Sequence, residues 1–297
     1  MTIITVNAER TYQVRLTQSW REDLASICEG RTRVAVIVSE TYAPDLTALM
    51  TFDFELHVFQ VPDAENGKSI ATLNKLWNWL GAAGFTRSDV VIGIGGGAVT
   101  DLAGFAAASW LRGLDWVAVP TSLAGMVDAS VGGKTGINSD YGKNLIGAFH
   151  SPIAVLIDTN FLSTLSDRDI AAGMAEVIKC GFIADPEILG LAGAHSVATL
   201  RQNPDVISEL IRRAVSVKAQ VVSSDFKESF AREALNYGHT LGHAIEIFSK
   251  YKLRHGEAVS IGLVYAAELA LARGLISKEE VELHRSILSA YGLPITY

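Results

Sequence analysis

The chain has 297 residues, of which 49% are hydrophobic and 19% are charged, so it can bury a large core and does not fit the disordered class. A net charge of −7 without any block of like charges argues against a nucleic-acid partner. Two isolated cysteines, no apolar run of about 18 residues and no signal-peptide pattern at the N-terminus predict a cytoplasmic protein without a membrane span.

The first half of the chain alternates between strand and helix patterns. Short apolar runs or period-two patterns predict strands at 33–38, 54–59, 90–94, 116–119 and 153–157. Helical spacing of apolar residues predicts helices at 68–80 and from about 100 to 112. Strands separated by helices predict an open, mostly parallel sheet.

The second half contains no convincing strand pattern. Helices are predicted at 168–184, 205–223, 232–250, 256–273 and 278–291. The change in pattern predicts a Rossmann-like α/β domain over residues 1–160, followed by an all-helical domain over 161–297. A cleft between two such domains is a usual place for a ligand.

A glycine-rich turn follows the strand at 90–94. Gly93, Gly95, Gly96 and Gly97 precede Ala98 and the next helix. A helix N-terminus offers free amides to a phosphate, and glycine allows close approach, so the turn suits a nucleotide. Thr121 and Ser122 follow the next strand, where a second ligand loop is expected. A tight turn without a ligand is the alternative.

A second glycine-rich segment carries two lysines and an asparagine. Gly132-Gly133-Lys134-Thr135 resembles part of a Walker A motif, but Asp128 occupies the position of its first glycine, so an ATPase is rejected. What remains is a predicted loop with Lys134, Lys143 and Asn144, which suits an anionic ligand. A solvated surface loop is the alternative.

The predicted helix at 232–250 carries an unusual set of polar residues. At about 100° per residue, Arg232, Asn236, His239, His243 and Glu246 fall within an arc of roughly 80°. Gly238 and Gly242 would each cost such a helix on the order of 1 kcal/mol, which a close helix contact or a ligand could offset. A solvent-facing stripe is the alternative.

Acidic and imidazole side chains in this half are candidate metal ligands. His239 and His243 are four residues apart, but Thr240 stands where an HExxH metalloprotease has its glutamate. Glu176 and His255 are further candidates, although a single Glu or His on a helix is usually structural or solvated. Imidazole and carboxylate together suit an ion such as zinc.

Taken together and in this order, these segments resemble the 3-dehydroquinate synthase family of sugar-phosphate cyclases, which use NAD and a metal. The resemblance rests on matched segments at 95–101, 104–108, 120–122, 127–135, 142–149, 175–179, 235–244 and 255–259. It implies an α/β NAD domain, a helical metal domain and a homodimer.

The resemblance implies a ligand set for each cofactor. The metal, zinc or cobalt, would be held by Glu176, His239 and His255, so that His243 would face substrate instead. Residues that match the family's NAD contacts are Asp63, Glu65, Lys68, Gly96, Gly97, Ala98, Val99, Thr100, Asp101, Thr121, Ser122, Asp128, Lys134, Lys143, Phe161, Leu162, Ser163 and Thr164.

The family's substrate is a heptulosonate that carries a phosphate and a carboxylate. Cationic residues that match its site are Arg112, Lys134, Lys143, Lys179, Lys218 and Arg232, and Arg112 resembles a residue that the partner subunit supplies. The polar matches are Asp128, Asn144, Glu228, Asn236 and His243. Concentrated positive charge would let a chain of net charge −7 hold such an anion.

The implied reaction converts 3-deoxy-D-arabino-heptulosonate 7-phosphate to 3-dehydroquinate and phosphate. It combines transient oxidation by NAD, phosphate elimination, re-reduction and aldol closure, and it regenerates NAD. Related cyclases tend to alter the positions of Arg232, Asn236 and His243, so these three favour the dehydroquinate reaction.

Two departures from the family pattern leave alternatives open. The sequence ends at Tyr297, before a lysine-bearing segment of the family that contacts substrate, and Ala124 replaces a common leucine. A truncated chain that binds NAD and zinc without turnover is one alternative. A metal- and NAD-dependent alcohol or glycerol dehydrogenase of the same fold group is another.

Overall fold

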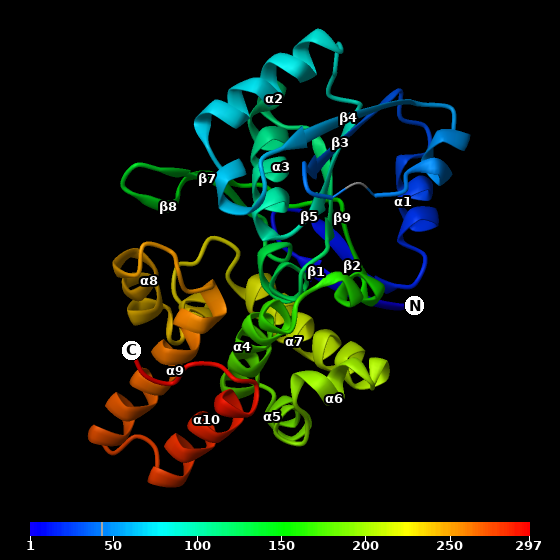
Figure 1. Cartoon of the computed structure of the whole chain (residues 1–297). Helices are drawn as coiled ribbons and strands as arrows, with labels where there is room; N and C mark the ends of the chain where they lie inside the picture. Colours follow the sequence, from blue (N-terminus) through cyan, green and yellow to red (C-terminus); the bar gives the residue numbers. More distant parts are fainter. Residues whose placement is uncertain (43) are drawn as a thin grey trace. The chain divides into compact units, whose positions relative to one another are not determined.

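A computed structural model describes residues 1–42 and 44–297, which form two compact units, Met1–Phe161 and Leu162–Tyr297. The first unit is an α/β unit and the second is helical (Figure 1). The expected fold class is therefore confirmed. Among the described residues, no helix is both long and apolar enough to cross a membrane.

A seven-stranded sheet forms the centre of the first unit. In spatial order it consists of β1 (Thr2–Asn7), β2 (Thr11–Thr17), β9 (Ala154–Asp158), β6 (Asp115–Pro120), β5 (Val90–Gly95), β3 (Arg33–Ser39) and β4 (Glu55–Val61). All neighbours are parallel except β1 and β2. The mostly parallel sheet is confirmed. The antiparallel β1–β2 pair is an addition that the periodicity did not reveal.

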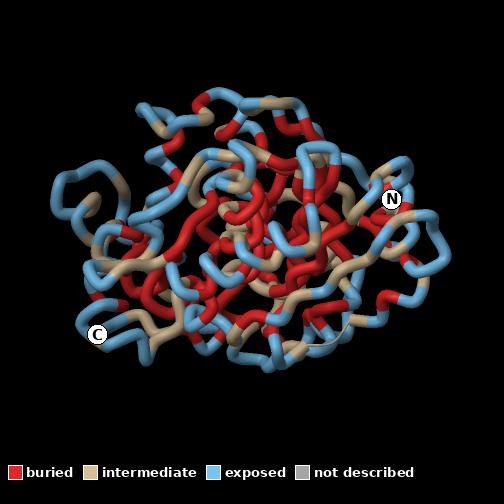
Figure 2. Tube along the Cα trace, turned by 90° about the horizontal axis from the view of Figure 1, so that it is seen from above, coloured by how far each residue is buried: buried red, intermediate tan, exposed pale blue. Residues whose placement is uncertain are grey.

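Apolar strands and their helices supply the core of this unit. Strand β5 is buried along its whole length, and β3 is buried from Val34 to Ser39. The helices are α1 (Trp20–Cys28), α2 (Ile70–Ala82) and α3 (Gly97–Ser109), and α3 packs on β5 and β6. Figure 2 shows long buried stretches, in red, that are bounded by exposed loops. Burial on both faces explains why these strands are continuously apolar.

The lysine-bearing segment is not a loop, which corrects the prediction. It forms an antiparallel hairpin of β7 (Lys134–Ser139) and β8 (Gly142–Phe149). A methyl group on Gly136 would lie 2.6 Å from the Ile146 carbonyl oxygen, and one on Gly147 would overlap Thr135. The glycines that suggested a loop are needed instead because the two strands approach closely.

The helical unit contains seven α-helices in its described residues. They are α4 (Asp167–Ile183), α5 (Pro186–Gly193), α6 (Val197–Arg201), α7 (Pro204–Ser224), α8 (His239–Phe248), α9 (His255–Ala272) and α10 (Lys278–Ala290). Helix α4 packs against α7 and α9, and α8 packs against α9. The predicted helices at 168–184, 205–223, 256–273 and 278–291 are confirmed with small shifts of their ends.

The continuous helix predicted at 232–250 is wrong. A short 3-10 turn, η6 (Ala231–Asn236), is followed by Gly238 in the left-handed region, with φ 78°, and α8 begins only at His239. Arg232 and Asn236 therefore do not share a helical face with His239, His243 and Glu246. The break follows from packing, because a side chain on Gly238 would lie 2.7 Å from the Leu263 amide of α9.

Candidate functional site

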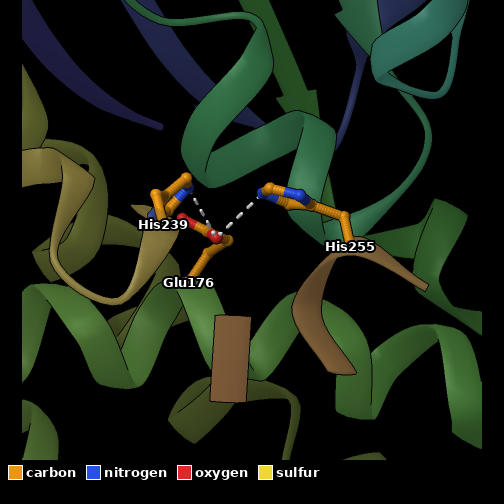
Figure 3. Close-up of side chains that lie close together, drawn as sticks. All are labelled: Glu176, His239 and His255. Carbon is orange, nitrogen blue, oxygen red and sulfur yellow. Dashed lines mark ion pairs between the residues drawn. The ribbon is translucent and has the colours of Figure 1, made fainter. Parts of the chain in front are cut away.

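Glu176, His239 and His255 meet within the helical unit (Figure 3). Glu176 lies in the middle of α4, while His239 and His255 are the first residues of α8 and α9. The Nε2 atoms of His239 and His255 lie 3.7 Å and 3.3 Å from Oε1 of Glu176. One ligand atom from each residue falls within 4.8 Å of the others, which is close enough for a single cation.

Glycines bring the three helices together at this point. A methyl group on Gly256 would overlap the Ala172 carbonyl of α4, and one on Gly262 would overlap Gly238 at the start of α8. On Gly242 it would lie 3.3 Å from the Ala258 carbonyl oxygen. The close helix contact expected to offset Gly238 and Gly242 is therefore present. This contact keeps the first turns of α8 and α9 close together and keeps α9 close to α4.

An ion pair between side chains also holds α4 and α9 together. Arg168 of α4 donates two hydrogen bonds to the Glu257 carboxylate of α9, at 2.5 Å and 2.8 Å. The same carboxylate accepts the Arg254 amide and so caps the helix that begins at His255. The cap fixes the position of the His255 backbone relative to α4.

Oxygen Oε1 of Glu176 has no hydrogen-bond partner among the described residues, although it is buried. The other oxygen, Oε2, accepts a hydrogen bond from Lys179 Nζ at 2.5 Å. A buried carboxylate oxygen without a partner costs free energy, about 1–3 kcal/mol or more for a charged group. A cation between this oxygen and the two imidazoles would remove that cost, and this donor set suits an ion such as zinc.

The electrostatics of the cluster favour a bound positive charge. Burial would raise the pKa of Glu176, but Lys179, His255 and His239 outweigh it and hold that pKa well below its usual range. Burial would lower the pKa of His255, but Glu176 and Glu246 outweigh it and raise that pKa to about 10. Both shifts express a need for positive charge between buried carboxylates, which a metal ion can meet in place of a proton.

Three other candidate residues of the helical unit carry buried positive charge. Lys179, Lys218 and Arg232 are buried, and Arg232 donates to the Phe226 carbonyl at 2.6 Å. His243 is exposed, and its ring centroid lies 5.2 Å from that of His239. Asn236 donates to Glu228 Oε1 at 2.9 Å, so these two candidates are in contact.

One residue that sequence reasoning missed supports this part of the site. Asp225 accepts hydrogen bonds from the amides of Ser229, Phe230 and Arg232, and these bonds hold its pKa below the usual range. It thereby fixes the loop that carries Glu228 and Arg232. An aspartate directly after a helix, four residues before a serine, is the signal that could have revealed it.

Two strand-end loops of the α/β unit lie side by side. The Thr121 amide donates to the Gly95 carbonyl at 2.8 Å. Gly96 is the N-cap of α3, and a methyl group there would lie 3.4 Å from Ser122 Oγ. Residues Gly97 to Asp101 form the start of α3. The amides of this helix start therefore lie beside the second loop.

Lys68 connects further candidates to these loops. Its side chain is 2% exposed and donates to Asp101 Oδ2 at 2.6 Å and also to Asn144 Oδ1. Burial raises the pKa of Asp101 to about 6, although Lys68 opposes the shift. Glu65 accepts from Asn138 of β7 at 2.6 Å. The hairpin with Lys134 and Lys143 is thus tied to the start of α3.

The remaining candidates lie on turns of both units. Asp63 accepts from Ser39 Oγ at 2.7 Å, and Asp128 lies in a turn of π-helix, η4 (Gly125–Ala129). Phe161, Leu162, Ser163 and Thr164 belong to η5 (Thr159–Thr164), where the first unit ends and the second begins.

Three candidates share a strained backbone. Arg112, Asn144 and Glu228 have φ of 68°, 57° and 60°, a region that residues other than glycine rarely adopt. Such strain costs on the order of 1–3 kcal/mol per residue and is concentrated at functional sites in proteins. Ala64, Leu111, Lys250 and Tyr251, which are not candidates, adopt the same backbone region.

Family models and a sequence relative match most or nearly all of the chain. A family model described as the 3-dehydroquinate synthase N-terminal part matches residues 58–172, and one described as the C-terminal part matches residues 173–297. A 3-dehydroquinate synthase of Mycolicibacterium gilvum is 50% identical over 298 aligned residues, which cover 99% of this chain and 83% of the relative.

Solved structures of related cyclases have the same fold. A 2-epi-5-epi-valiolone synthase of Streptomyces hygroscopicus, with NAD⁺ and Zn²⁺ bound, matches with a TM-score of 0.89 and 29% identity, over 99% of this chain and 84% of its own. A 2-deoxy-scyllo-inosose synthase complexed with carbaglucose-6-phosphate, NAD⁺ and Co²⁺ matches with a TM-score of 0.84 and 26% identity, over 98% and 82%. The chain belongs to the 3-dehydroquinate synthase family.

Proposed function

We propose that the chain catalyses the 3-dehydroquinate synthase reaction, the conversion of 3-deoxy-D-arabino-heptulosonate 7-phosphate to 3-dehydroquinate and phosphate. It would act as a carbon–oxygen lyase that depends on NAD and a divalent metal. The observation that carries the proposal is the buried Oε1 of Glu176, which accepts no hydrogen bond from the described residues and lies beside the Nε2 atoms of His239 and His255. The identity of 50% to a 3-dehydroquinate synthase supports it.

Glu176, His239 and His255 would hold the metal, zinc or cobalt. When bound, the metal supplies Lewis-acid polarisation of a substrate oxygen and NAD supplies a reversible hydride acceptor. Lys179 holds Oε2 of Glu176, so Oε1 stays turned toward the imidazoles. Three protein ligands leave coordination positions for substrate oxygens.

The cations would bind the phosphate and the carboxylate of the substrate. Lys179, Lys218 and Arg232 bring positive charge into the interior of the helical unit. In the other unit, Lys134 and Lys143 lie on the β7–β8 hairpin. Arginine suits a carboxylate because its guanidinium can donate two parallel hydrogen bonds, and lysine suits a phosphate as a point charge.

The polar residues would orient the substrate and move its protons. Asp225 fixes the turn that presents Glu228 and Arg232, while Asn236 is held against Glu228. Asp128 and Asn144 would make further substrate contacts from the α/β unit. His243 is exposed beside His239, and an imidazole there can accept or donate a proton near neutral pH.

NAD would bind at the carboxyl ends of β5 and β6. Amides at the start of α3 would meet the pyrophosphate, with Thr121 and Ser122 beside them. Asp63, Glu65, Lys68, Asp101 and the segment at 161–164 would complete the NAD site. We further propose a cytoplasmic homodimer in which Arg112 of one subunit reaches the substrate of the other.

Release of phosphate with a catalytic amount of NAD tests the proposal. Purified protein is mixed with the heptulosonate phosphate, Zn²⁺ or Co²⁺, and NAD far below the substrate concentration. Phosphate release over many turnovers without net NADH is expected. Steady NADH production from simple alcohols would instead indicate a dehydrogenase. Binding of zinc and NAD without either reaction would indicate a non-catalytic chain.

A further inference from the structure

Glu246 of α8 is a buried carboxylate that the proposed reaction does not use. Its side chain is 4% exposed, and Oε2 lies 3.2 Å from Nδ1 of His255. It is the last member of the polar set that the sequence singled out between Arg232 and Glu246. A buried acid beside a metal-ligand candidate requires a reason, since burial of a carboxylate is costly unless it is paired and hydrogen-bonded.

In both imidazoles of the proposed metal centre, Nε2 faces Glu176 and Nδ1 faces a second oxygen atom. In His255, Nε2 faces Glu176 at 3.3 Å while Nδ1 faces Glu246. In His239, Nε2 faces Glu176 at 3.7 Å while Nδ1 lies 3.2 Å from the Tyr237 carbonyl oxygen. A carbonyl oxygen only accepts hydrogen bonds, so Nδ1 of His239 must carry the hydrogen. In both rings Nε2 is then the atom that can bind a cation.

We propose that Glu246 is a positioning residue for the metal ligand His255. Its carboxylate accepts the Nδ1–H hydrogen bond, which sets the tautomer and orientation of the ring and leaves the Nε2 lone pair toward the ion. Its negative charge also makes the imidazole a stronger ligand. This inference rests on the proposed metal at Glu176, His239 and His255.

A second cation is the competing explanation for Glu246. His243, Glu246 and His255 also offer ligand atoms within 4.8 Å of one another. An ion there would have to bind Nδ1 of His255, so the same ring would lose both hydrogens and bridge two cations. The hydrogen bond from Nδ1 of His255 to Glu246 needs no such loss of hydrogen. In addition, the second set is not enclosed like the first, because His243 is exposed while Glu246 is buried. The geometry therefore favours one cation with a supporting carboxylate.

Zinc affinity of matched variants tests the role of Glu246. The wild-type chain, Glu246→Gln and Glu268→Gln are titrated with Zn²⁺ against a chromophoric chelator, and each metal-free protein is first checked for folding by circular dichroism. Glu268 is a suitable control because it lies on α9, and its change removes the same charge from a 2.5 Å pair with Arg285. We expect one Zn²⁺ per chain, an affinity about 10–100-fold lower for Glu246→Gln, and no change for Glu268→Gln.

The outcomes separate this inference from the proposed metal. Wild-type affinity in Glu246→Gln, or an equal loss in Glu268→Gln, would overturn the inference while the metal centre stands. Two Zn²⁺ per chain, with the second lost in His243→Ala, would also overturn it. If the wild-type chain binds no Zn²⁺, both proposals fail together.

A measurement on the wild-type chain covers the case in which Glu246→Gln does not fold. Nitrogen chemical shifts of ¹⁵N-labelled histidine in the zinc-loaded protein report which ring nitrogen carries hydrogen and which binds metal. We expect His255 to show a protonated Nδ1 and a metal-bound Nε2. A metal-bound Nδ1 would refute the role of Glu246.

Discussion

The two units build their candidate sites in different ways. In the α/β unit, the glycine turn of the candidate nucleotide site is one continuous segment, from the end of β5 into the start of α3. In the helical unit, the candidate metal ligands Glu176, His239 and His255 come from three helices and meet because glycines let those helices touch. The first site depends on local backbone geometry, and the second on packing between distant segments.

Gly96 of the nucleotide turn differs in its surroundings from two glycines of the helical unit. A methyl group on Gly96 would make only ordinary contact, 3.4 Å from Ser122 Oγ. On Gly256 or Gly262 it would overlap a backbone carbonyl of a neighbouring helix. Substitutions at these positions should therefore separate loss of a ligand from loss of the fold.

The largest effect should come from removing a metal ligand. His239→Ala takes one of three donors from the centre, so we expect zinc content to fall from one ion per chain to none that survives dialysis. His243→Ala, the matched change one turn later on α8, should keep its zinc and lose turnover. Metal analysis of the dialysed proteins measures both, and equal zinc loss in the two variants would contradict the ligand assignment.

The next largest effect should come from disturbing the contact between α9 and α4. Gly256→Ala would force α9 away from Ala172 of α4, so we expect a loss of about 3 kcal/mol in the free energy of unfolding and weaker zinc binding. Urea unfolding of the metal-free proteins measures the first effect.

Gly190→Ala is the control for this contact. Gly190 lies within α5, and a methyl group there would meet nothing within 4 Å. Alanine favours a helix over glycine, so this variant should be unchanged or more stable by about 0.5–1 kcal/mol. If both variants have wild-type stability, close contact at Gly256 does not hold α4 and α9 together.

Substitution of Gly96 should weaken nucleotide binding and leave the fold unchanged. Its φ of −67° suits any residue, so Gly96→Ala should fold normally and keep zinc. The methyl group would occupy space that a pyrophosphate needs, and we expect the Kd for NAD to rise about tenfold, equivalent to about 1.4 kcal/mol. Displacement of fluorescent NADH by NAD measures the affinity. Unchanged affinity would remove Gly96 from the proposed NAD site.

The difference between local geometry and packing of distant segments also decides which features the sequence could predict. The strand β5, its glycine turn and α3 form one local pattern. Periodicity predicted both elements, although α3 begins at Gly97 and not at about Thr100. The break at Gly238 is set by contact with Leu263, which lies 25 positions later, so periodicity wrongly extended a helix through it. The β7–β8 hairpin was missed because its glycines resemble those of a loop. Glu176 and His255 were connected to His239 only by the family resemblance.

The smallest effect should come from His284, which supports the turn before His239. It is 4% exposed and its ring stacks on Phe182, with centroids 3.5 Å apart. Its Nδ1 lies 2.7 Å from the Glu280 carbonyl oxygen, so Nδ1 carries the hydrogen and Nε2 accepts from the Tyr237 hydroxyl at 2.9 Å. Protonation of Nε2 would break the hydrogen bond to Tyr237.

Stability should therefore depend on pH through this residue. Burial lowers the pKa of His284, although Glu280, the charged group beside it, opposes the shift. Below about pH 6.5 the unfolded chain then binds more protons here than the folded chain, so this contribution to stability falls as pH decreases, by at most about 1.4 kcal/mol per pH unit. His284→Gln should lose that part of the slope. Urea unfolding with excess chelator at pH 7.5, 6.5 and 5.5 compares the two proteins, whose other histidines are the same, and parallel curves would mean that His284 is not kept neutral by the fold.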